Sequence, residues 1–246
     1  MEQRWEVGGV RVSAAAGTSV GLRYRANFDV LHLDSTVPLV VVADGMGDGR
    51  GSAVAGRMAV DRFVVGVRAA AGRVDPAGLR ALVADIQDRV RAVGAELDEL
   101  TGCTLTALVA GPDAGAWIVQ LGDSRAYRLR DGLLELLTVD HTEAWLGAVY
   151  GWYPPESPAA ASARYHLYRY VGHPRAPEPD LLNVSLRPGD TYLLCTDGLA
   201  EQVSYPRLAE LLAGADLAGA VATLLDDALA AGGRDNATAV LLRVTA

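Results

Sequence analysis

The chain has 246 residues, a length that fits one or two domains, and half of its residues are hydrophobic, so it can bury a core of its own. Its formal net charge of −8 argues against a surface built to hold nucleic acid or anionic lipid. All 22 basic residues are arginine, which excludes every chemistry that needs a lysine amine, including a Walker phosphate loop and a Schiff base.

The expected strands are short apolar runs rich in Val, Leu and Thr. In chain order they cover residues 5–12, 17–24, 29–34, 38–43, 103–110, 116–121, 125–130, 190–196 and 237–244. Many of these runs follow one another with no helix between them. This order favours antiparallel sheets, because antiparallel strands can be joined by short turns.

Helical periodicity lies between the runs of strands. It is clearest over residues 76–99, where apolar side chains recur every three or four positions and predict one buried face. Further helices are expected at 52–68, 206–213 and 216–231, the last ending at a Gly-Gly pair. Helices grouped between strands predict an α+β fold in which helices cover the outer faces of packed antiparallel sheets.

Residues 143–175 form the least regular part of the sequence. Four prolines interrupt them, and they hold five of the nine tyrosines. We expect an irregular insertion or lid here, within a single domain that spans residues 1–246. Its tyrosines fit either a partner surface or ordinary packing; they are Tyr150, Tyr153, Tyr165, Tyr168 and Tyr170.

The sequence shows no feature of a membrane or secreted protein. The longest uncharged stretch, residues 100–112, is too short for a membrane span, and the N-terminus lacks the basic and then apolar start of a signal peptide. Cys103 and Cys195 fit no zinc or redox spacing, so we expect buried free thiols in a reducing compartment. These features predict a cytoplasmic protein without membrane insertion.

Carboxylates stand at the ends of three apolar runs, at Asp44-Gly45, Gly122-Asp123 and Asp197-Gly198, and Asp235 precedes the last expected strand. Each alone is most simply a turn, because Asp-Gly and Asp-Asn are favoured turn dipeptides. At the ends of neighbouring strands, however, they can converge on one rim of a sheet, where their mutual repulsion calls for cations. Carboxylate oxygens suit Mg²⁺ or Mn²⁺, and two such ions can activate a water that attacks phosphorus.

The chain carries six short motifs in a fixed order. They are Asp44-Gly-Met-Gly47, Gly102-Cys-Thr-Leu105, Gly122-Asp-Ser-Arg125, Leu137-Thr-Val-Asp-His-Thr142, Leu194-Cys-Thr-Asp-Gly-Leu199 and Gly233-Arg-Asp-Asn-Ala-Thr238. Together they resemble the motif set of the metal-dependent Ser/Thr protein phosphatases, the PPM or type 2C family, over residues 17–244. The resemblance implies a four-layer α/β/β/α sandwich, with two central antiparallel sheets between helices and a metal cleft at one end.

The resemblance also implies roles for the aspartates. Asp44 would bridge two catalytic metal ions, with the carbonyl of Gly45 as a ligand of the second ion. Asp197 and Asp235 would bind the first ion. Asp123 matches the residue that in bacterial members helps to hold a third, weaker ion.

Two further residues have supporting roles by the same resemblance. Asn236 would support Asp235 without touching the metal. His141 corresponds to a residue that mainly orders a loop through hydrogen bonds. It is also the obvious substitute for the catalytic histidine that many family members have at the position of Gly49.

Residues 23–29, Arg-Tyr-Arg-Ala-Asn-Phe-Asp, resemble the family's Arg-x-x-Asn-Glu-Asp segment. In that segment the arginine holds the substrate phosphate and the acids serve the second metal, and Asp29 fits this pattern. Neither Arg23 nor Arg25 has the usual spacing from Asn27. We favour Arg25 as the phosphate-binding residue, with Arg23 as its rival.

The chain departs from the family pattern at two positions. Phe28 stands where the family usually has a glutamate linked to the second metal, so we expect this metal to bind weakly. Gly49 stands where many members have a histidine that protonates the leaving alkoxide. Another group would have to supply that proton.

The resemblance implies an enzyme that hydrolyses phosphoserine and phosphothreonine on proteins with two Mn²⁺ or Mg²⁺ ions and opposes a cellular Ser/Thr kinase. The alternative is a degenerate phosphatase fold that binds and regulates a phosphoprotein without turnover, as Phe28 and Gly49 suggest. We prefer the enzyme, because loss of function should erode the metal aspartates and all four central ones are present. Either way the expected partners are phosphorylated proteins.

Overall fold

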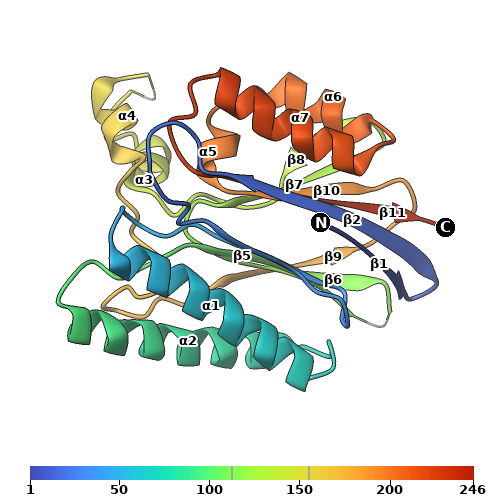
Figure 1. Ribbon diagram of the computed structural model, residues 1–246, viewed down its shortest axis with the longest axis horizontal. Coiled ribbons are helices and arrows are strands. Elements are labelled where there is room, and N and C mark those ends of the chain that lie inside the picture. Colours follow the sequence, from blue (N-terminus) through green and yellow to red (C-terminus); the bar gives the residue numbers. More distant parts are fainter. Residues whose placement is uncertain (112, 155) are drawn as a thin grey trace.

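The computed structural model of the protein describes residues 1–111, 113–154 and 156–246. Two antiparallel sheets lie face to face at its centre, and helices cover both outer faces (Figure 1). This arrangement confirms the predicted four-layer α/β/β/α sandwich.

The sheets are built from strands that are far apart in the sequence. The first sheet runs in the order β1 (Glu2–Val7), β2 (Val10–Ser19), β11 (Ala237–Thr245), β10 (Thr191–Cys195), β7 (Arg125–Arg130) and β8 (Leu133–Leu136). The second runs in the order β3 (Val30–Leu33), β4 (Leu39–Ala43), β5 (Leu105–Ala110), β6 (Gly115–Leu121) and β9 (Asp180–Ser185). The two ends of the chain therefore lie in one sheet, because β2 pairs with β1 on one side and with β11, the last strand, on the other.

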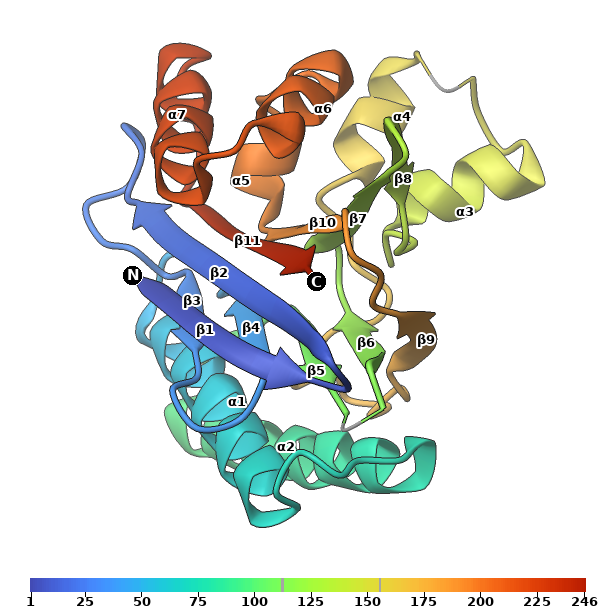
Figure 2. The ribbon, with the colours of Figure 1, turned by 90° about the vertical axis from the view of Figure 1, so that its right-hand side faces the viewer.

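The helices form two outer layers and a cap at one end (Figures 1 and 2). The second sheet is covered by α1 (Arg50–Ala69) and α2 (Pro76–Leu97). The first is covered by α5 (Asp197–Ala200), α6 (Tyr205–Ala213) and α7 (Leu217–Ala230). The shorter helices α3 (Glu143–Tyr150) and α4 (Pro158–Ala163) pack on each other beyond the strand ends. No helix of the described ranges is both long and apolar enough to cross a membrane.

Three hydrophobic layers hold the sandwich together, one between the sheets and one under each helical layer. Strand β4 shows why its sequence is apolar throughout, because all five residues are fully buried. Val40 and Val42 face the other sheet, whereas Leu39, Val41 and Ala43 face α1 and α2. Each such side chain contributes about 1.5–3 kcal/mol when it is buried. A strand covered on both sides needs this continuous run.

The N-terminal strands differ from the expected ones. The expected strand at 5–12 is wrong, because Gly8 and Gly9, with φ of +53° and +83°, form a two-residue hairpin turn between β1 and β2. Both positions favour glycine, since other residues are strained at positive φ. The expected strand at 17–24 continues β2 only as far as Ser19, and the chain then leaves the sheet.

The remaining differences concern short or exposed elements. Strand β9 has only one fully buried residue, and β8 is four residues long, so neither shows the apolar run by which strands are recognised. The segment 143–175 contains α3 and α4, and is therefore more regular than expected. Thr142 caps α3 and Ser157 caps α4, through hydrogen bonds from backbone N–H groups to their hydroxyls.

Candidate metal and active site

Four of the predicted aspartates meet at one end of the sandwich, where strands of both sheets end. Asp44 follows β4 and Asp123 follows β6 in the second sheet. In the first sheet, Asp197 begins α5 just after β10, and Asp235 lies two residues before β11. All four line one cleft with a volume of about 340 Å³. Strand ends from two packed sheets thus bring together residues that are up to 191 positions apart.

Gly198 lets two of these acidic segments pack together. A Cβ at Gly198 would lie 2.0 Å from the carbonyl oxygen of Asn236 and 3.0 Å from the Cβ of Asp235. Such contacts are too close for any side chain, so only glycine permits them. The Asp197-Gly198 pair is therefore the start of a short helix pressed against the last motif, and not a simple turn.

Asp29 is buried next to this cleft, beside the hydroxyls of two strand-end threonines. Its Oδ2 accepts hydrogen bonds from Thr196 Oγ1 (2.8 Å) and Thr238 Oγ1 (2.7 Å). Its Oδ1, like Oδ1 of Asp197, is buried with no hydrogen-bond partner among the described residues. Burying an unpaired carboxylate oxygen is costly, and either a proton or a bound cation would offset that cost.

The electrostatics of the cleft favour protons or cations on its carboxylates. Burial is the largest cause that raises the pKa of all five aspartates, Asp29, Asp44, Asp123, Asp197 and Asp235. It raises the pKa of Asp29 to about 7 and that of Asp197 to about 6. Neighbouring carboxylates raise the pKa of Asp44 further, chiefly Asp29 and Asp197. None of the ion pairs in the described ranges includes any of the five.

The donor set fits hard divalent cations. It consists of carboxylate oxygens and backbone carbonyls, with no histidine or cysteine side chain lining the described cleft. Across residues 1–111, 113–154 and 156–246, no three His, Cys, Asp or Glu side chains are gathered tightly enough to enclose an ion by themselves. Mg²⁺ usually keeps several water ligands and uses only one or two carboxylates, so a closed protein cage is not required.

Asn236 fastens the loop before β3 to the last motif. Its Oδ1 accepts a hydrogen bond from the backbone N–H of Phe28 (2.7 Å). Its Nδ2 donates to the carbonyl oxygens of Val20 (2.8 Å) and Ala26 (3.2 Å). The backbone N–H of Asn236 also donates to Asp235 Oδ1 (2.8 Å). One buried side chain therefore fixes the position of residues 20–28 relative to Asp235.

The two candidate arginines differ in whether they line the cleft. Arg23 lines the cleft, with its Cζ 5.0 Å from the ring centre of Tyr24, an arrangement suited to a cation–π contact. Arg25 is exposed and does not line the cleft. The geometry therefore favours Arg23 over Arg25, the reverse of our preference from the sequence.

Tyr24 and Phe28 form an aromatic wall of the cleft. Both line it, and their rings meet edge to face with centres 6.2 Å apart. Our sequence reasoning did not single out Tyr24. The available signal was its position three residues before Asn27, where the family segment has its arginine. Gly49 lies outside the cleft lining and is the N-cap of α1.

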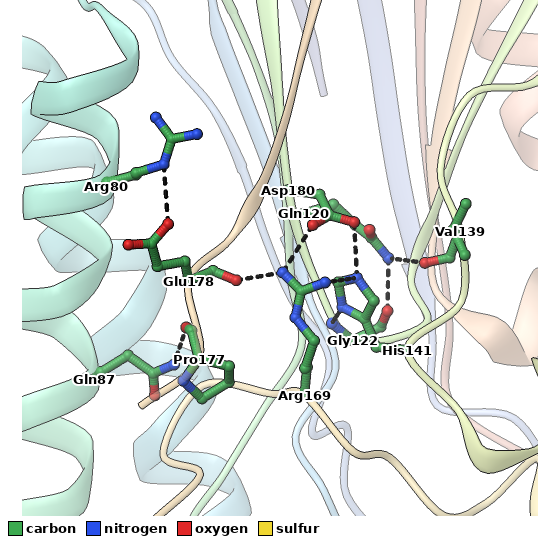
Figure 3. Close-up of polar contacts among 10 residues, drawn as sticks. All are labelled: Arg80, Gln87, Gln120, Gly122, Val139, His141, Arg169, Pro177, Glu178 and Asp180. Carbon is green, nitrogen blue, oxygen red and sulfur yellow. Dashed lines mark hydrogen bonds and ion pairs between the residues drawn. The ribbon is translucent and has the colours of Figure 1, made fainter. Parts of the chain in front are cut away.

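His141 is almost fully buried and holds the turn that carries Asp123 (Figure 3). Its Nδ1 accepts a hydrogen bond from the backbone N–H of Gly122 (3.0 Å), so the ring proton is on Nε2, which donates to Asp180 Oδ2 (3.0 Å). Burial lowers the pKa of His141, and the hydrogen bond to Asp180 offsets this only in part. A neutral ring with both nitrogens engaged fits the loop-ordering role expected of His141.

The contacts of His141 continue to α2 (Figure 3). Arg169 donates to Asp180 Oδ1 (2.7 Å) and to the carbonyl oxygen of Glu178. The carboxylate of Glu178 in turn pairs with Arg80 of α2 (3.2 Å). The turn that carries Asp123 is thus connected through side chains to the segment 169–180 and to the outer helical layer.

The five tyrosines of segment 143–175 lie in different environments. Tyr153 donates from Oη to the carbonyl oxygen of Glu143, and Tyr150 stacks on Trp152 with ring centres 5.6 Å apart. Tyr165 lines the cleft but is 68% exposed. A second cavity of about 200 Å³, between the strand ends and α3 and α4, shares Asp123 and Asp197 with the cleft. The segment therefore borders the acidic site directly.

Comparisons with known proteins identify the relatives of this chain. Residues 26–231 match the family model described as protein phosphatase 2C. The serine/threonine protein phosphatase PstP of Mycobacterium tuberculosis is 34% identical over 94% of this chain and 44% of its own length. The serine/threonine phosphatase stp of Listeria monocytogenes is 30% identical over 83% of this chain and 84% of its own length.

Solved structures give the same result. The catalytic domain of PstP in complex with two manganese ions superposes with a TM-score of 0.83 at 32% identity, over 96% of this chain and 99% of that one. The PPM Ser-Thr phosphatase MsPP of Mycobacterium smegmatis gives a TM-score of 0.80 at 31% identity, over 94% and 97%. The chain spans less than half the length of the PstP protein that it matches. The sequence match and the fold together show that the chain belongs to the protein phosphatase 2C family.

Proposed function

We propose that this chain is a metal-dependent phosphomonoester hydrolase that removes phosphate from phosphoserine and phosphothreonine on proteins. One feature supports this function most directly: five aspartates that make no ion pair in the described ranges lie in or beside the cleft, and two of them, Asp29 and Asp197, have a buried oxygen with no hydrogen-bond partner there. Keeping such a group ionised requires cations, and paired divalent cations are a common means of hydrolysing phosphate esters. The family relatives named as serine/threonine phosphatases point to the same reaction.

We assign the cations to the residues that the cleft brings together. Asp44 would be a ligand common to two Mn²⁺ or Mg²⁺ ions, the carbonyl of Gly45 would be a ligand of the second, and Asp197 and Asp235 would be ligands of the first. Asp29 would serve the second ion. The two manganese ions in the structure of the PstP catalytic domain support this number.

Asp123 would complete the assignment as a ligand of a third, weaker ion. Like Asp197, it lines both the cleft and the neighbouring cavity. When bound, the cations supply the charge that lowers the pKa of a water molecule and offsets charge on the phosphoryl oxygens.

The protein side chains orient the substrate and keep the site rigid. Arg23 is the cationic side chain of the cleft wall, and its guanidinium suits the planar pairs of oxygens on a phosphate. Asn236 holds the loop that carries Arg23, because it donates hydrogen bonds to the carbonyl oxygens of Val20 and Ala26. Thr196 and Thr238 fix Asp29 through its Oδ2, which leaves Oδ1 available.

The proposed substrates are phosphorylated proteins in the cytoplasm, and the opposing enzyme is a Ser/Thr kinase. The net charge of −8 does not favour nucleic acid as a partner. Both cysteines are buried free thiols, as we expect for a protein of a reducing compartment.

The test is turnover of a phosphothreonine peptide by the purified chain. We expect hydrolysis with Mn²⁺ or Mg²⁺ and none after chelation, and Asp197→Asn should lower kcat roughly a hundredfold or more because it removes a cation ligand. Asp226→Asn is the matched control, since Asp226 is an exposed aspartate of α7 far from the cleft lining. Equal turnover with and without metal, or full activity of the Asp197 variant, would contradict the proposal.

A further inference from the structure

Hydrolysis of a serine or threonine phosphate requires a proton for the departing oxygen. The alkoxide of a serine or threonine is a poor leaving group, and a positioned acid commonly supplies its proton. No histidine lines the cleft within the described ranges. The guanidinium of Arg23 cannot release a proton, and the hydroxyl of Thr104 is engaged with Ser124 Oγ (2.7 Å) and with the backbone N–H of Asp44 (2.8 Å). Apart from the carboxyl groups, the described cleft therefore offers two phenols, Tyr24 and Tyr165.

The two phenols differ in how firmly they are held. Tyr165 is 68% exposed, whereas Tyr24 is half-buried between the edge of Phe28 and the guanidinium of Arg23. The loop of Tyr24 is fastened at both ends, by Asn236 and by the hydrogen bond from the backbone N–H of Leu22 to the carbonyl oxygen of Gly233 (2.7 Å). A proton donor must be held in place, so Tyr24 is the better placed of the two.

The surroundings of Tyr24 keep its phenol protonated. Burial raises the pKa of Tyr24, and the negative charge of Asp235 raises it further. No side-chain hydrogen bond among the described residues occupies its hydroxyl. The proton on Oη is therefore present at neutral pH, and no other side chain of the described residues holds it by a hydrogen bond.

We propose that Tyr24 is the catalytic residue that protonates the leaving oxygen of the substrate. This inference rests on the proposed phosphatase function. In the step, the oxygen of a water forms a bond to phosphorus while the bond from phosphorus to the serine or threonine oxygen breaks. The Oη proton of Tyr24 passes to that oxygen, giving a neutral alcohol. The attacking water releases a proton, which returns the Tyr24 phenolate to a phenol. The products are the alcohol and inorganic phosphate.

The test compares two substrates that differ in their need for this proton. The leaving group of a phosphothreonine peptide is an alkoxide, whereas that of p-nitrophenyl phosphate is a stable phenolate. With Mn²⁺, Tyr24→Phe should lower kcat roughly a hundredfold on the peptide and far less on p-nitrophenyl phosphate, so the ratio of the two rates changes at least about tenfold. Tyr165→Phe is the matched control, because it removes the other phenol of the cleft, and its ratio should stay within about twofold.

Further measurements separate this step from other roles of Tyr24. The phenylalanine variant keeps the ring that contacts Phe28, so its thermal unfolding and Mn²⁺ binding should match those of the unsubstituted protein. Across aryl phosphates, its rate should depend more steeply on the acidity of the leaving phenol. Equal slowing on both substrates, as expected for phosphate binding, would overturn the inference, and so would no slowing on either. If the unsubstituted protein hydrolyses neither substrate with Mn²⁺, the proposed phosphatase function is wrong, and the proton transfer from Tyr24 is wrong with it.

Discussion

Asp34 and the aspartates of the cleft have opposite surroundings. Asp34, in the turn between β3 and β4, is fully buried and satisfied on both oxygens. Its Oδ1 accepts hydrogen bonds from the backbone N–H groups of Thr36 (2.8 Å) and Val37 (3.0 Å), and its Oδ2 contacts His32 Nε2 and Arg68 Nε, each at 2.8 Å. Burial alone would raise the pKa of Asp34, but the hydrogen bonds outweigh it and hold the pKa below its usual range. This aspartate stabilises a turn.

The aspartates of the cleft make no ion pair among the described residues, and Asp44, Asp197 and Asp235 are less deeply buried than Asp34. Asp44 has other carboxylates as its main charged neighbours, and burial together with Asp29 and Asp197 raises its pKa. The two kinds of aspartate therefore differ in their charged neighbours. Carboxylates collected without a cationic partner reduce the stability of the metal-free protein, and the binding of cations can offset that cost.

The largest expected effect is on Asp44. Asp44→Asn should lower metal-dependent kcat roughly a hundredfold or more, because it removes the ligand shared by both cations. The same change should raise the Tm of the metal-free protein, since one of the mutually repelling carboxylates is gone. Phosphatase assays and thermal unfolding in chelator measure the two effects. A variant that is less stable without metal would contradict the distinction between the two groups.

The opposite result is expected at Asp34. Asp34→Asn should lower the free energy of unfolding by about 2–4 kcal/mol, because the amide cannot accept on both sides and leaves the Arg68 contact repulsive. Its kcat with Mn²⁺ should change little. Urea unfolding and the peptide assay test this, and a large loss of kcat in a stably folded variant would count against it.

A smaller effect is expected at His141. His141→Ala leaves the buried N–H of Gly122 without an acceptor and should cost about 1–3 kcal/mol of unfolding free energy. His141→Asn is the matched variant, because its amide oxygen can take the place of Nδ1, and it should lose less. Equal losses in urea unfolding would show that the hydrogen bond to Gly122 is not what matters.

The smallest effect is the dependence of Tm on pH. The pKa values of Asp29 and Asp197 are raised to about 7 and about 6, so the folded state without metal holds protons that the unfolded state releases near pH 4. The contribution of these two groups to stability is therefore fully present below about pH 4 and is lost as the pH rises to about 7. The Tm in chelator should fall over this interval, and Asp29→Asn should flatten the fall. A Tm that rises from pH 4 to pH 7 in chelator would contradict the raised pKa values.

Local patterns in the sequence predicted what depends on local structure. The apolar run of β4 followed by Asp44 located both a central strand and an acidic residue at its end. Strand β9 was missed because it is an edge strand with mostly exposed side chains. The sequence favoured Arg25 over Arg23, whereas Arg23 is the one that lines the cleft; the path of their loop depends on Asn236, more than 200 positions away. Hydrogen bonds between residues so far apart in the chain produce no regular spacing that could be recognised in the sequence.

Calorimetric titration of the metal-free protein with Mn²⁺ tests the metal centre most directly. We expect two ions per chain for the unsubstituted protein, as in the PstP catalytic domain, and loss of binding in Asp44→Asn with no loss in Asp34→Asn. Protein that takes up no Mn²⁺, or binds it equally well without the Asp44 carboxylate, would show that the acidic cleft does not hold paired cations.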